Sequence, residues 1–386
     1  MKKQLSNRQI GSFISALVVI LMSFGVIFVA SASVRLDREY DFRRMYAYPE
    51  FRQGVFFLFS VLTLYVVSLF DYRRLRFKGA GLRRWFIGPL GSLVGFSIIL
   101  LLIVLLFADP INQARRWLQI PLGPITISFQ VSEFAKWSLI FFLAAAISQI
   151  GDEIRLFWSR FVPLCAIAGV VIGLIVIEDF GTAFFVSVLT FAMIFVGGAR
   201  LWHFLTPIPI LSTAFYFAVS LSQTRMNRLK AFFIPDANVA QTTGYQVRQA
   251  LIAVGTGGIL GKGLGRGISK YGHLPEDTTD FIFAIIAEEL GFIGAVCVIL
   301  LFVAFVVLGI MVVCRCEDKF GKLLAFGIVL AISAQAVINI GVVTHLLPTK
   351  GIALPFVSAG GSGMLLGSVA VGVLVNIAKS CDERRL

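Results

Sequence analysis

Residues 274–291, LPEDTTDFIFAIIAEELG, hold five of the chain's 21 acidic residues within 18 positions. One of them, Asp280, stands where a polar segment passes into a long apolar one. A carboxylate at such a boundary, among arginine and lysine residues, stays ionised and can accept a proton as a general base. Aspartate is also common in the first turn of a helix, where free N–H groups and the helix dipole stabilise its charge. Asp277 is better placed for that capping role, and the residues alone leave both interpretations of Asp280 open.

Charged residues also stand inside other apolar stretches. Each costs about 2.5–3.5 kcal/mol to insert into a bilayer, so such residues seldom lack a role. Glu133 and Lys136 are three positions apart, which makes them neighbours on a helix and able to pair. The sequence EDFGT, which contains Asp179, separates two apolar stretches. Salt bridges that join helices are a sufficient explanation for Glu133, Lys136 and Glu288.

These residues belong to a chain whose composition indicates a membrane protein. Of its 386 residues, 58% are hydrophobic and 14% are charged, whereas a soluble domain carries roughly a quarter charged residues. Apolar runs of about 18 or more residues recur along the chain, as in helices that span a bilayer. We therefore expect one all-α polytopic membrane domain, residues 1–386, with about ten transmembrane helices. The expected spans are 11–33, 53–70, 86–108, 131–150, 161–177, 181–198, 203–222, 280–313, 321–344 and 354–378.

Basic residues set the orientation of these spans, because lysine and arginine concentrate in short cytoplasmic loops. With ten spans, the basic clusters within 2–8, 73–84, 315–322 and 379–385 fall on one side of the membrane. We therefore expect both termini in the cytoplasm and a long extracytoplasmic loop, 223–279, between spans 7 and 8. The net charge of +13 is dispersed among loops, which argues against nucleic acid as a partner.

The 223–279 loop carries more positive than negative charge, against the usual tendency of exterior loops. Such an excess indicates an anionic partner. Within the loop, residues 255–267, GTGGILGKGLGRG, contain seven glycines in 13 positions together with Lys262 and Arg266. Glycines allow a backbone to approach a phosphate closely, and tight helix packing or a hinge is the alternative explanation. The segment PFVSAGGSG, which includes Ser358, similarly interrupts the start of the last span.

Seven segments follow one another between about residues 114 and 363. They are ARRWLQI, FQVSEFAKW, EDFGT, RMNRLKAFFIPD, GYQVRQALIAVGTGGILGKGLG, LPEDTTDFIFAIIAEELGFIG and NIGVVTHLLPTKGIALPFVSAGGSG. Together, and in this order, they resemble the SEDS family (shape, elongation, division and sporulation), which includes FtsW and RodA. The ten-span layout also agrees with that family. The stretches GLGRGISKYGHLPEDTTDFIFAIIAEELG and LLPTKGIALPFVSAGGS look closer to FtsW than to RodA.

The resemblance implies a peptidoglycan glycosyltransferase of the cytoplasmic (inner) membrane. Such enzymes polymerise lipid II, a disaccharide-pentapeptide carried on undecaprenyl pyrophosphate, on the extracytoplasmic side. The family's essential aspartate, in Thr-Asp-Phe, corresponds to Asp280. Members of the family typically work with a class B penicillin-binding protein, a transpeptidase with one span, and the resemblance to FtsW implies other divisome proteins as partners.

Other functional positions of the family also have counterparts here. The resemblance places the family's intramembrane glutamate and lysine on Glu133 and Lys136. The aspartate of its Asp-x-Gly-Thr motif corresponds to Asp179. Its arginine pair after the seventh span corresponds to Arg225 and Arg228.

These assignments give a mechanistic hypothesis. Asp280 takes the proton of the acceptor sugar's 4-hydroxyl, the oxygen attacks the anomeric carbon of the growing chain, and undecaprenyl pyrophosphate leaves. The leaving group carries at least two negative charges, so cations must stabilise it. No organic cofactor is expected, and a divalent cation, magnesium or manganese, is a possible addition. The candidate substrate-binding residues are Arg115, Arg116, Arg225, Arg228, Lys262 and Arg266, and the intramembrane polar residues are Glu133, Lys136, Asp179, Glu288 and Ser358.

Other functions suit the same sequence features. A RodA-like polymerase of cell elongation is the nearest alternative to the septal enzyme. A lipid II flippase or secondary transporter also combines about ten spans with midplane charges and broken helices, although the two halves of the chain show no convincing repeat. A scaffold for a divisome partner is a third class, which predicts that substitution of Asp280 leaves growth unaffected.

Overall fold

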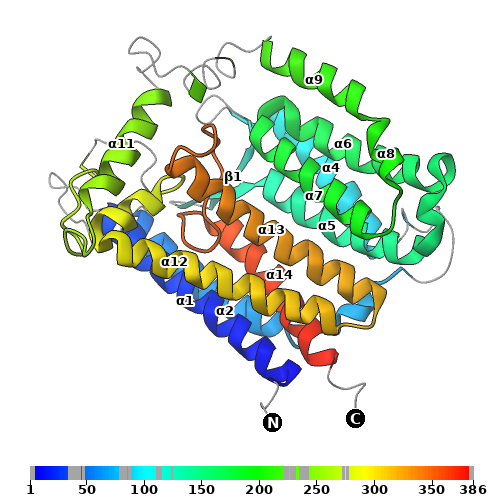
Figure 1. Cartoon of the computed structure of the whole chain (residues 1–386), viewed down its shortest axis with the longest axis horizontal. Helices are drawn as coiled ribbons and strands as arrows, with labels where there is room; N and C mark the ends of the chain where they lie inside the picture. Colours follow the sequence, from blue (N-terminus) through cyan, green and yellow to red (C-terminus); the bar gives the residue numbers. More distant parts are fainter. Residues whose placement is uncertain are drawn as a thin grey trace.

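A computed structural model of the chain describes residues 5–33, 45, 48–77, 85, 88–109, 115–122, 125–220, 226, 232–233, 243–271, 274 and 278–381. Within these ranges the protein is almost entirely helical, and eight helices are long and apolar enough to cross a bilayer (Figure 1). They are α1 (Asn7–Ser33), α2 (Pro49–Val67), α4 (Pro89–Phe107), α5 (Val131–Ile150), α6 (Val162–Glu178), α12 (Ile282–Arg315), α13 (Lys319–Val343) and α14 (Gly361–Ser380). A further apolar helix, α7 (Phe180–Val196), is shorter than the span Phe157–Glu178, in which the turn Phe157–Phe161 continues into α6. The expected all-α polytopic class is confirmed, and the count of ten spans stays a prediction.

The apolar sequence of these helices explains why they form. Backbone N–H and C=O groups have no partners in a bilayer, so a spanning segment must satisfy them within itself as a helix. Both α2 and α4 begin with a proline, Pro49 and Pro89. Proline suits the first helical turn because the N–H that it lacks would have no partner within the helix there.

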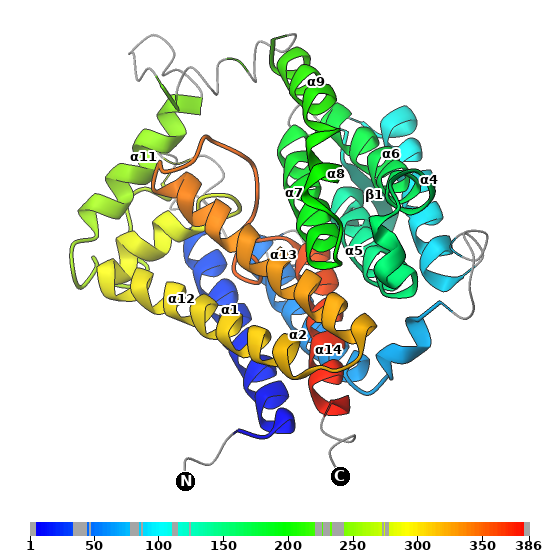
Figure 2. The same cartoon turned by 45° about the vertical axis from the view of Figure 1, so that its right-hand side comes forward.

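The helices pack around two central ones, α5 and α13. Helix α5 is buried along nearly its whole length and contacts α4, α6, α7 and α13. Helix α13 also contacts α7, α12 and α14, and so joins the α4–α7 group to the helices near the two ends of the chain (Figures 1 and 2). Helices α1, α2, α12 and α14 pack on one another. Both termini lie at the same end of the molecule (Figure 1).

The chain between α7 and α12 is less regular than expected. The stretch expected to form one span at 203–222 is divided into α8 (Leu201–Leu205) and α9 (Ile208–Ser220). Pro207 lies at the interruption and has no N–H to continue the first helix. The 223–279 region contains a helix, α11 (Thr243–Thr256), where the sequence predicted only a loop.

The last helix, α14, begins at Gly361 rather than at residue 354. Residues 344–360 before it form an irregular segment, in which Leu354 and Val357 are buried in the core. This segment crosses α1 so closely that a Cβ on Gly25 would lie 2.6 Å from the carbonyl oxygen of Phe356. Glycine at position 25 therefore allows the segment to pack inside the bundle.

Helix α12 is broken at Gly291, whose φ of 68° and ψ of −163° are not helical. Figure 2 shows the resulting change of direction. Residues 292–315 after the break extend about 36 Å as a helix, which is enough to cross a hydrocarbon core of about 30 Å. The expected regular helix over 280–313 is therefore wrong. Glu288 lies in the buried segment before the break, beyond the part that suffices to cross the bilayer.

A two-stranded hairpin joins α4 to α5 and was not expected from the sequence. Strands β1 (Trp117–Leu122) and β2 (Ile125–Gln130) are antiparallel, with Trp117 opposite Gln130. Isoleucine and threonine, which favour strands, recur in β2. The base of the hairpin is closed by a hydrogen bond from the N–H of Val131 to the carbonyl of Arg116 at 3.3 Å, so the hairpin sets the position of Arg116.

Candidate active site

Asp280 lies in a turn immediately before α12, which begins at Ile282. The expectation that Asp280 occupies the first helical turn is therefore wrong, and the N-cap position is taken by Phe281 without a side-chain hydrogen bond. Asp277, the expected cap, lies outside the described residues. Asp280 is half-buried, so a capping role does not account for it and part of it is accessible from outside the protein.

Two elements hold the backbone of this turn. The side-chain amide of Asn339, on α13, donates hydrogen bonds to the carbonyls of Asp280 and Ile352, both at 2.8 Å. The hydroxyl of Ser358 donates to the carbonyl of Thr279 at 2.6 Å. The turn is thus fixed from α13 and from the irregular segment before α14, and this is the role that the structure gives to Ser358.

Asp280 and Arg116 both lie beside Gly351. A Cβ placed on Gly351 would lie 3.0 Å from Oδ2 of Asp280 and 3.9 Å from Nη2 of Arg116, and Gly351 itself is exposed. The carboxylate and the guanidinium therefore border the same exposed glycine. A side chain at position 351 would crowd the carboxylate of Asp280.

Arg116 is held by an acidic residue at the start of α7. Its Nη1 lies 2.9 Å from Oδ2 of Asp179, which is only 8% exposed. Asp179 also caps α7, accepting hydrogen bonds from the N–H and the hydroxyl of Thr182, both at 2.9 Å. Arg116 Nε is buried and has no hydrogen-bond partner among the described residues. The fold thus orients Arg116 through Asp179.

A further cation, Lys350, belongs to this site and was not singled out from the sequence. Its ammonium lies 3.9 Å from the ring centroid of Phe184, and its stem passes close to Gly181, two residues after Asp179. Burial lowers the pKa of Lys350, and the charge of Asp179 acts in the opposite direction. The signal available in the sequence was a lysine directly before a glycine, between two apolar stretches.

A small pocket lies beside the two arginines, with a volume of about 20 Å³. Arg115 lies at its polar end, where its N–H donates to Oε2 of Glu178 at 2.8 Å and its Nη1 donates to the carbonyl of Leu105 at 3.2 Å. The lining residues are Leu101, Val104 and Leu105 of α4, Val131 and Ser132 of α5, Leu174, Ile175 and Glu178 of α6, and Arg115, Arg116 and Asp179. Cationic groups therefore lie next to apolar side chains in this pocket.

The pair expected from the spacing of Glu133 and Lys136 is confirmed, with Nζ and Oε2 2.6 Å apart. Lys136 Nζ also donates to Oε1 of Gln335 at 2.9 Å. Gln335 in turn donates to the carbonyl of Ala353 at 3.0 Å. This buried network supports the irregular segment that packs against the Asp280 turn, which agrees with a structural role for Glu133 and Lys136.

The remaining candidate cations are not brought to Asp280 by the described residues. Lys262 Nζ lies 2.6 Å from Oε1 of Glu288, which is fully buried. The positive charge of Lys262 and the negative charge of Glu288 therefore neutralise each other within the protein. Arg266 is exposed on the same glycine-rich loop. Arg225 and Arg228 lie outside the described residues, and their roles stay predictions.

The described residues hold no group of three His, Cys, Asp or Glu side chains that could bind a metal ion. The positive charge that this part of the chain supplies near Asp280 comes from Arg116 and Lys350.

Comparison with known proteins adds to this geometry. The sequence model of the family described as cell cycle protein, FtsW/RodA/SpoVE, matches residues 12–383. A protein of Coxiella burnetii named "Probable peptidoglycan glycosyltransferase FtsW" is 35% identical over 370 residues, 94% of each chain. One of the same name from Trichlorobacter lovleyi is 36% identical over 365 residues, 94% of this chain and 91% of its own.

Two solved structures share the fold. A chain from a structure named "Structural coordination of polymerization and crosslinking by a peptidoglycan synthase complex" superposes with a TM-score of 0.72 at 23% identity, covering 95% of this chain and 97% of its own. The rod shape determining protein RodA of Thermus thermophilus superposes with a TM-score of 0.64 at 24% identity, covering 95% and 96%.

Proposed function

The chain belongs to the FtsW/RodA/SpoVE family of cell cycle proteins, and from that premise we propose that it polymerises lipid II into glycan strands during septal cell wall synthesis. The names of its relatives support a peptidoglycan glycosyltransferase. The observation that carries the proposal is the placement of the carboxylate of Asp280 and the guanidinium of Arg116 beside the exposed Gly351. A general base and a cation facing one accessible point are what glycosyl transfer from a pyrophosphate requires.

In the proposed reaction, Asp280 accepts the proton of the acceptor's 4-hydroxyl. That oxygen forms a bond with the anomeric carbon of the growing chain while the bond from this carbon to the pyrophosphate oxygen breaks. Because a carboxylate is a weak base at neutral pH, proton transfer accompanies formation of the new bond. The hydrogen bonds from Asn339 and Ser358 to the turn hold Asp280 in place during this step.

Cations next to Asp280 stabilise the departing undecaprenyl pyrophosphate. Arg116 is oriented by Asp179 before the substrate arrives, so little reorganisation is needed as negative charge develops. Lys350 and Arg115 are the nearby cations that we add to it. Arg225 and Arg228 keep the same role on the basis of the family resemblance alone.

The lipid tail needs a path from the bilayer to these cations. We propose that it approaches along the apolar side chains of α4, α5 and α6 that line the small pocket beside Arg115 and Arg116.

The proposed topology places the site outside the cytoplasmic (inner) membrane and both termini in the cytoplasm, which the basic loops support. Partners follow from the family: a class B penicillin-binding protein and other divisome proteins. The structural relative named for coordinated polymerisation and crosslinking by a peptidoglycan synthase complex supports a transpeptidase partner.

Reconstitution with lipid II tests the proposal. The purified protein in vesicles receives lipid II on the outer side, with and without a transpeptidase partner, and the products are separated by size. Glycan polymer is the expected product. Transbilayer movement of lipid II without polymer would replace the proposal with a transporter. Depletion in cells then decides between septal and elongation synthesis, since loss of a septal enzyme leaves filaments and loss of an elongation enzyme leaves round cells.

A further inference from the structure

The glycine-rich loop between α11 and α12, residues 257–271, points large apolar side chains away from the protein. Leu260 is 79% exposed and Ile259 is 70% exposed, and Leu264 and Ile268 are exposed as well. Exposed apolar side chains that lie together on a protein surface mark a contact with another apolar surface, such as the interior of a membrane. From the sequence, phosphate binding and tight helix packing or a hinge were the alternative explanations of this loop, and none of them explains these four outward-facing side chains.

Part of the loop's backbone is paired within the protein. The N–H groups of Lys262 and Gly263 donate to the carbonyls of Glu288 and Glu289, both at 3.0 Å. In the other direction, the N–H of Phe292 donates to the carbonyl of Gly258 at 2.9 Å. The loop thus pairs with the backbone groups that the break in α12 leaves without helical partners. Internal pairing of this kind lowers the cost of placing irregular backbone at the membrane boundary.

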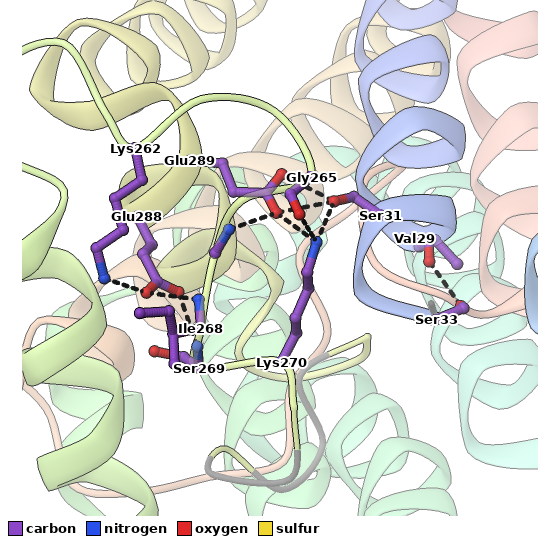
Figure 3. Close-up of polar contacts among 11 residues, drawn as sticks. Val29, Ser31, Ser33, Lys262, Gly265, Ile268, Ser269, Lys270, Glu288 and Glu289 are labelled. Atoms are coloured by element: carbon purple, nitrogen blue, oxygen red, sulfur yellow. Dashed lines mark hydrogen bonds and ion pairs between the residues drawn. The ribbon is translucent and has the colours of Figure 1, made fainter. Parts of the chain in front are cut away.

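The lysines of the loop are neutralised inside the protein (Figure 3). Lys262 pairs with Glu288 at 2.6 Å and Lys270 pairs with Glu289 at 2.9 Å. Both glutamates are fully buried, and Glu289 also accepts from the hydroxyl of Ser31 on α1 at 2.8 Å. These pairs remove the charge that would otherwise oppose contact with lipid.

One basic residue of the loop differs from the two paired lysines. Arg266 is exposed, and no carboxylate of the described residues lies within ion-pair distance of it. A long arginine side chain can extend its guanidinium toward the headgroups while its stem stays among apolar groups. Arg266 is therefore compatible with a lipid-facing loop.

The point at which the loop is bonded to α12 determines how deep the loop lies in the membrane. Residues 292–315 extend about 36 Å and so reach across a core of about 30 Å. Phe292 and Ile293, at the start of this span, are 66% and 56% exposed and continue the lipid-facing surface of the helix. The loop is bonded to residues 288–293, so it lies where this span meets the headgroups, in the leaflet away from the two termini.

We propose that residues 257–271 form a lipid-facing element whose exposed side chains enter the acyl region at the headgroup boundary of one leaflet. Its partner is the lipid bilayer, and Ile259, Leu260 and Leu264 are the residues in contact with acyl chains. The loop thereby anchors both α11 and the break in α12 at the membrane surface. The identity of this leaflet as the outer one rests on the proposed topology. The proposed contact with lipid does not depend on that topology.

A nitroxide spin label measures the depth directly. The label is attached to Leu260→Cys in a chain whose five cysteines, all free thiols, are replaced by alanine, and the protein is reconstituted alone into phospholipid vesicles. Collision rates with oxygen, which concentrates in lipid, and with a water-soluble nickel chelate are compared. Leu300→Cys, an exposed position within the α12 span, is the lipid control, and Ser6→Cys before α1 is the water control.

We expect the ratio of oxygen to nickel collisions at Leu260 to be several-fold above that at Ser6 and below that at Leu300. Leu264→Cys gives a second site with the same expectation, so one misfolded variant does not decide the outcome. A ratio equal to the Ser6 value at both sites, in protein that keeps the thermal unfolding midpoint of the unlabelled parent, overturns the proposal. The measurement does not depend on catalytic activity, and its failure would leave the proposed function standing.

Discussion

At the scale of single residues, the proposed site depends on keeping a carboxylate and two cations close together. Arg116 is fixed by Asp179 through one nitrogen. Lys350 is held over Phe184 at 3.9 Å. The backbone of Asp280 is fixed by Asn339.

Arg116→Ala removes the cation that lies beside Gly351 and Asp280. We expect kcat for lipid II polymerisation to fall about 100- to 1,000-fold, as when one preorganised donor to a developing charge is removed. Steady-state kinetics of the purified protein measure this change. Arg160→Ala, which removes an arginine paired with the exposed Glu153, is the matched control and should retain activity. Equal rates in both variants would remove Arg116 from the site.

The lowered pKa of Lys350 predicts that kcat falls at alkaline pH. Burial lowers the pKa of Lys350 from its usual value of 10.5, so the ammonium loses its proton at lower pH than a free lysine. A step that needs this charge therefore slows as pH rises through the lowered pKa. Lys350→Arg keeps its charge throughout this range and should move the alkaline limb of the kcat profile to higher pH. Superimposable profiles would show that Lys350 does not act in the step.

Part of this residue-scale arrangement was accessible from the sequence. The spacing of Glu133 and Lys136 correctly predicted their pairing, whereas Asp280 lies in the turn before α12 and not in its first turn. Lys350 and Gly351 could not be found in the same way, because their importance depends on a fold that brings residues 350–351 next to Asp179 and Asp280. Spacing along one helix is a local property, whereas that contact joins three separate elements.

At the scale of elements, the irregular parts of the structure shape the site. The break in α12 separates its buried outer segment from the span, and the segment before α14 holds the Asp280 turn. Hydropathy does not reveal either feature, because apolar residues resume on both sides of Glu288, Glu289 and Gly291. The break depends on hydrogen bonds from the glycine-rich loop, about 30 residues earlier in the chain. The hairpin β1–β2 was missed because a short amphipathic stretch between two spans resembles an ordinary loop.

The ion pairs at the break can be tested by removing one partner and then both. Lys270→Met leaves the buried Glu289 carboxylate without its cation, which costs about 3–5 kcal/mol of stability. The double variant Lys270→Met with Glu289→Gln removes the unpaired charge and keeps an acceptor for Ser31, so it should recover most of the loss. Thermal unfolding in detergent measures both.

Arg266→Met is the matched control for these variants, because Arg266 is an exposed cation on the same loop. Its midpoint of thermal unfolding should stay close to that of the unchanged protein. A single variant Lys270→Met as stable as this control would contradict the role given to the pair.

At the scale of the whole molecule, the two ends of the chain and the candidate site lie in different parts of the structure. Both termini lie at one end (Figure 1), as an even number of spans requires. The orientation stays a prediction from lysine and arginine counts in short loops, which are independent of the detailed fold. The number of spans also stays a prediction, since the stretch around Pro207 is divided into two short helices.

Thiol labelling tests the topology. Ser6→Cys, in the chain without its own cysteines, should react with a membrane-impermeant maleimide only after the cytoplasmic membrane is opened, because the N-terminus is expected in the cytoplasm. Reaction in intact spheroplasts would invert the proposed orientation and place the Asp280 site on the wrong side for lipid-linked donors outside the membrane.

Lipid II polymerisation by the purified Asp280→Asn protein tests the central claim most directly. The side chain keeps its size and loses its ability to accept the proton, so we predict a normal unfolding midpoint, retained lipid II binding and no glycan product. Glu153→Gln, which changes an exposed carboxylate paired with Arg160, should polymerise at the normal rate under the same conditions. Glycan formation by Asp280→Asn at the rate of the unchanged protein would contradict the assignment of Asp280 as the general base.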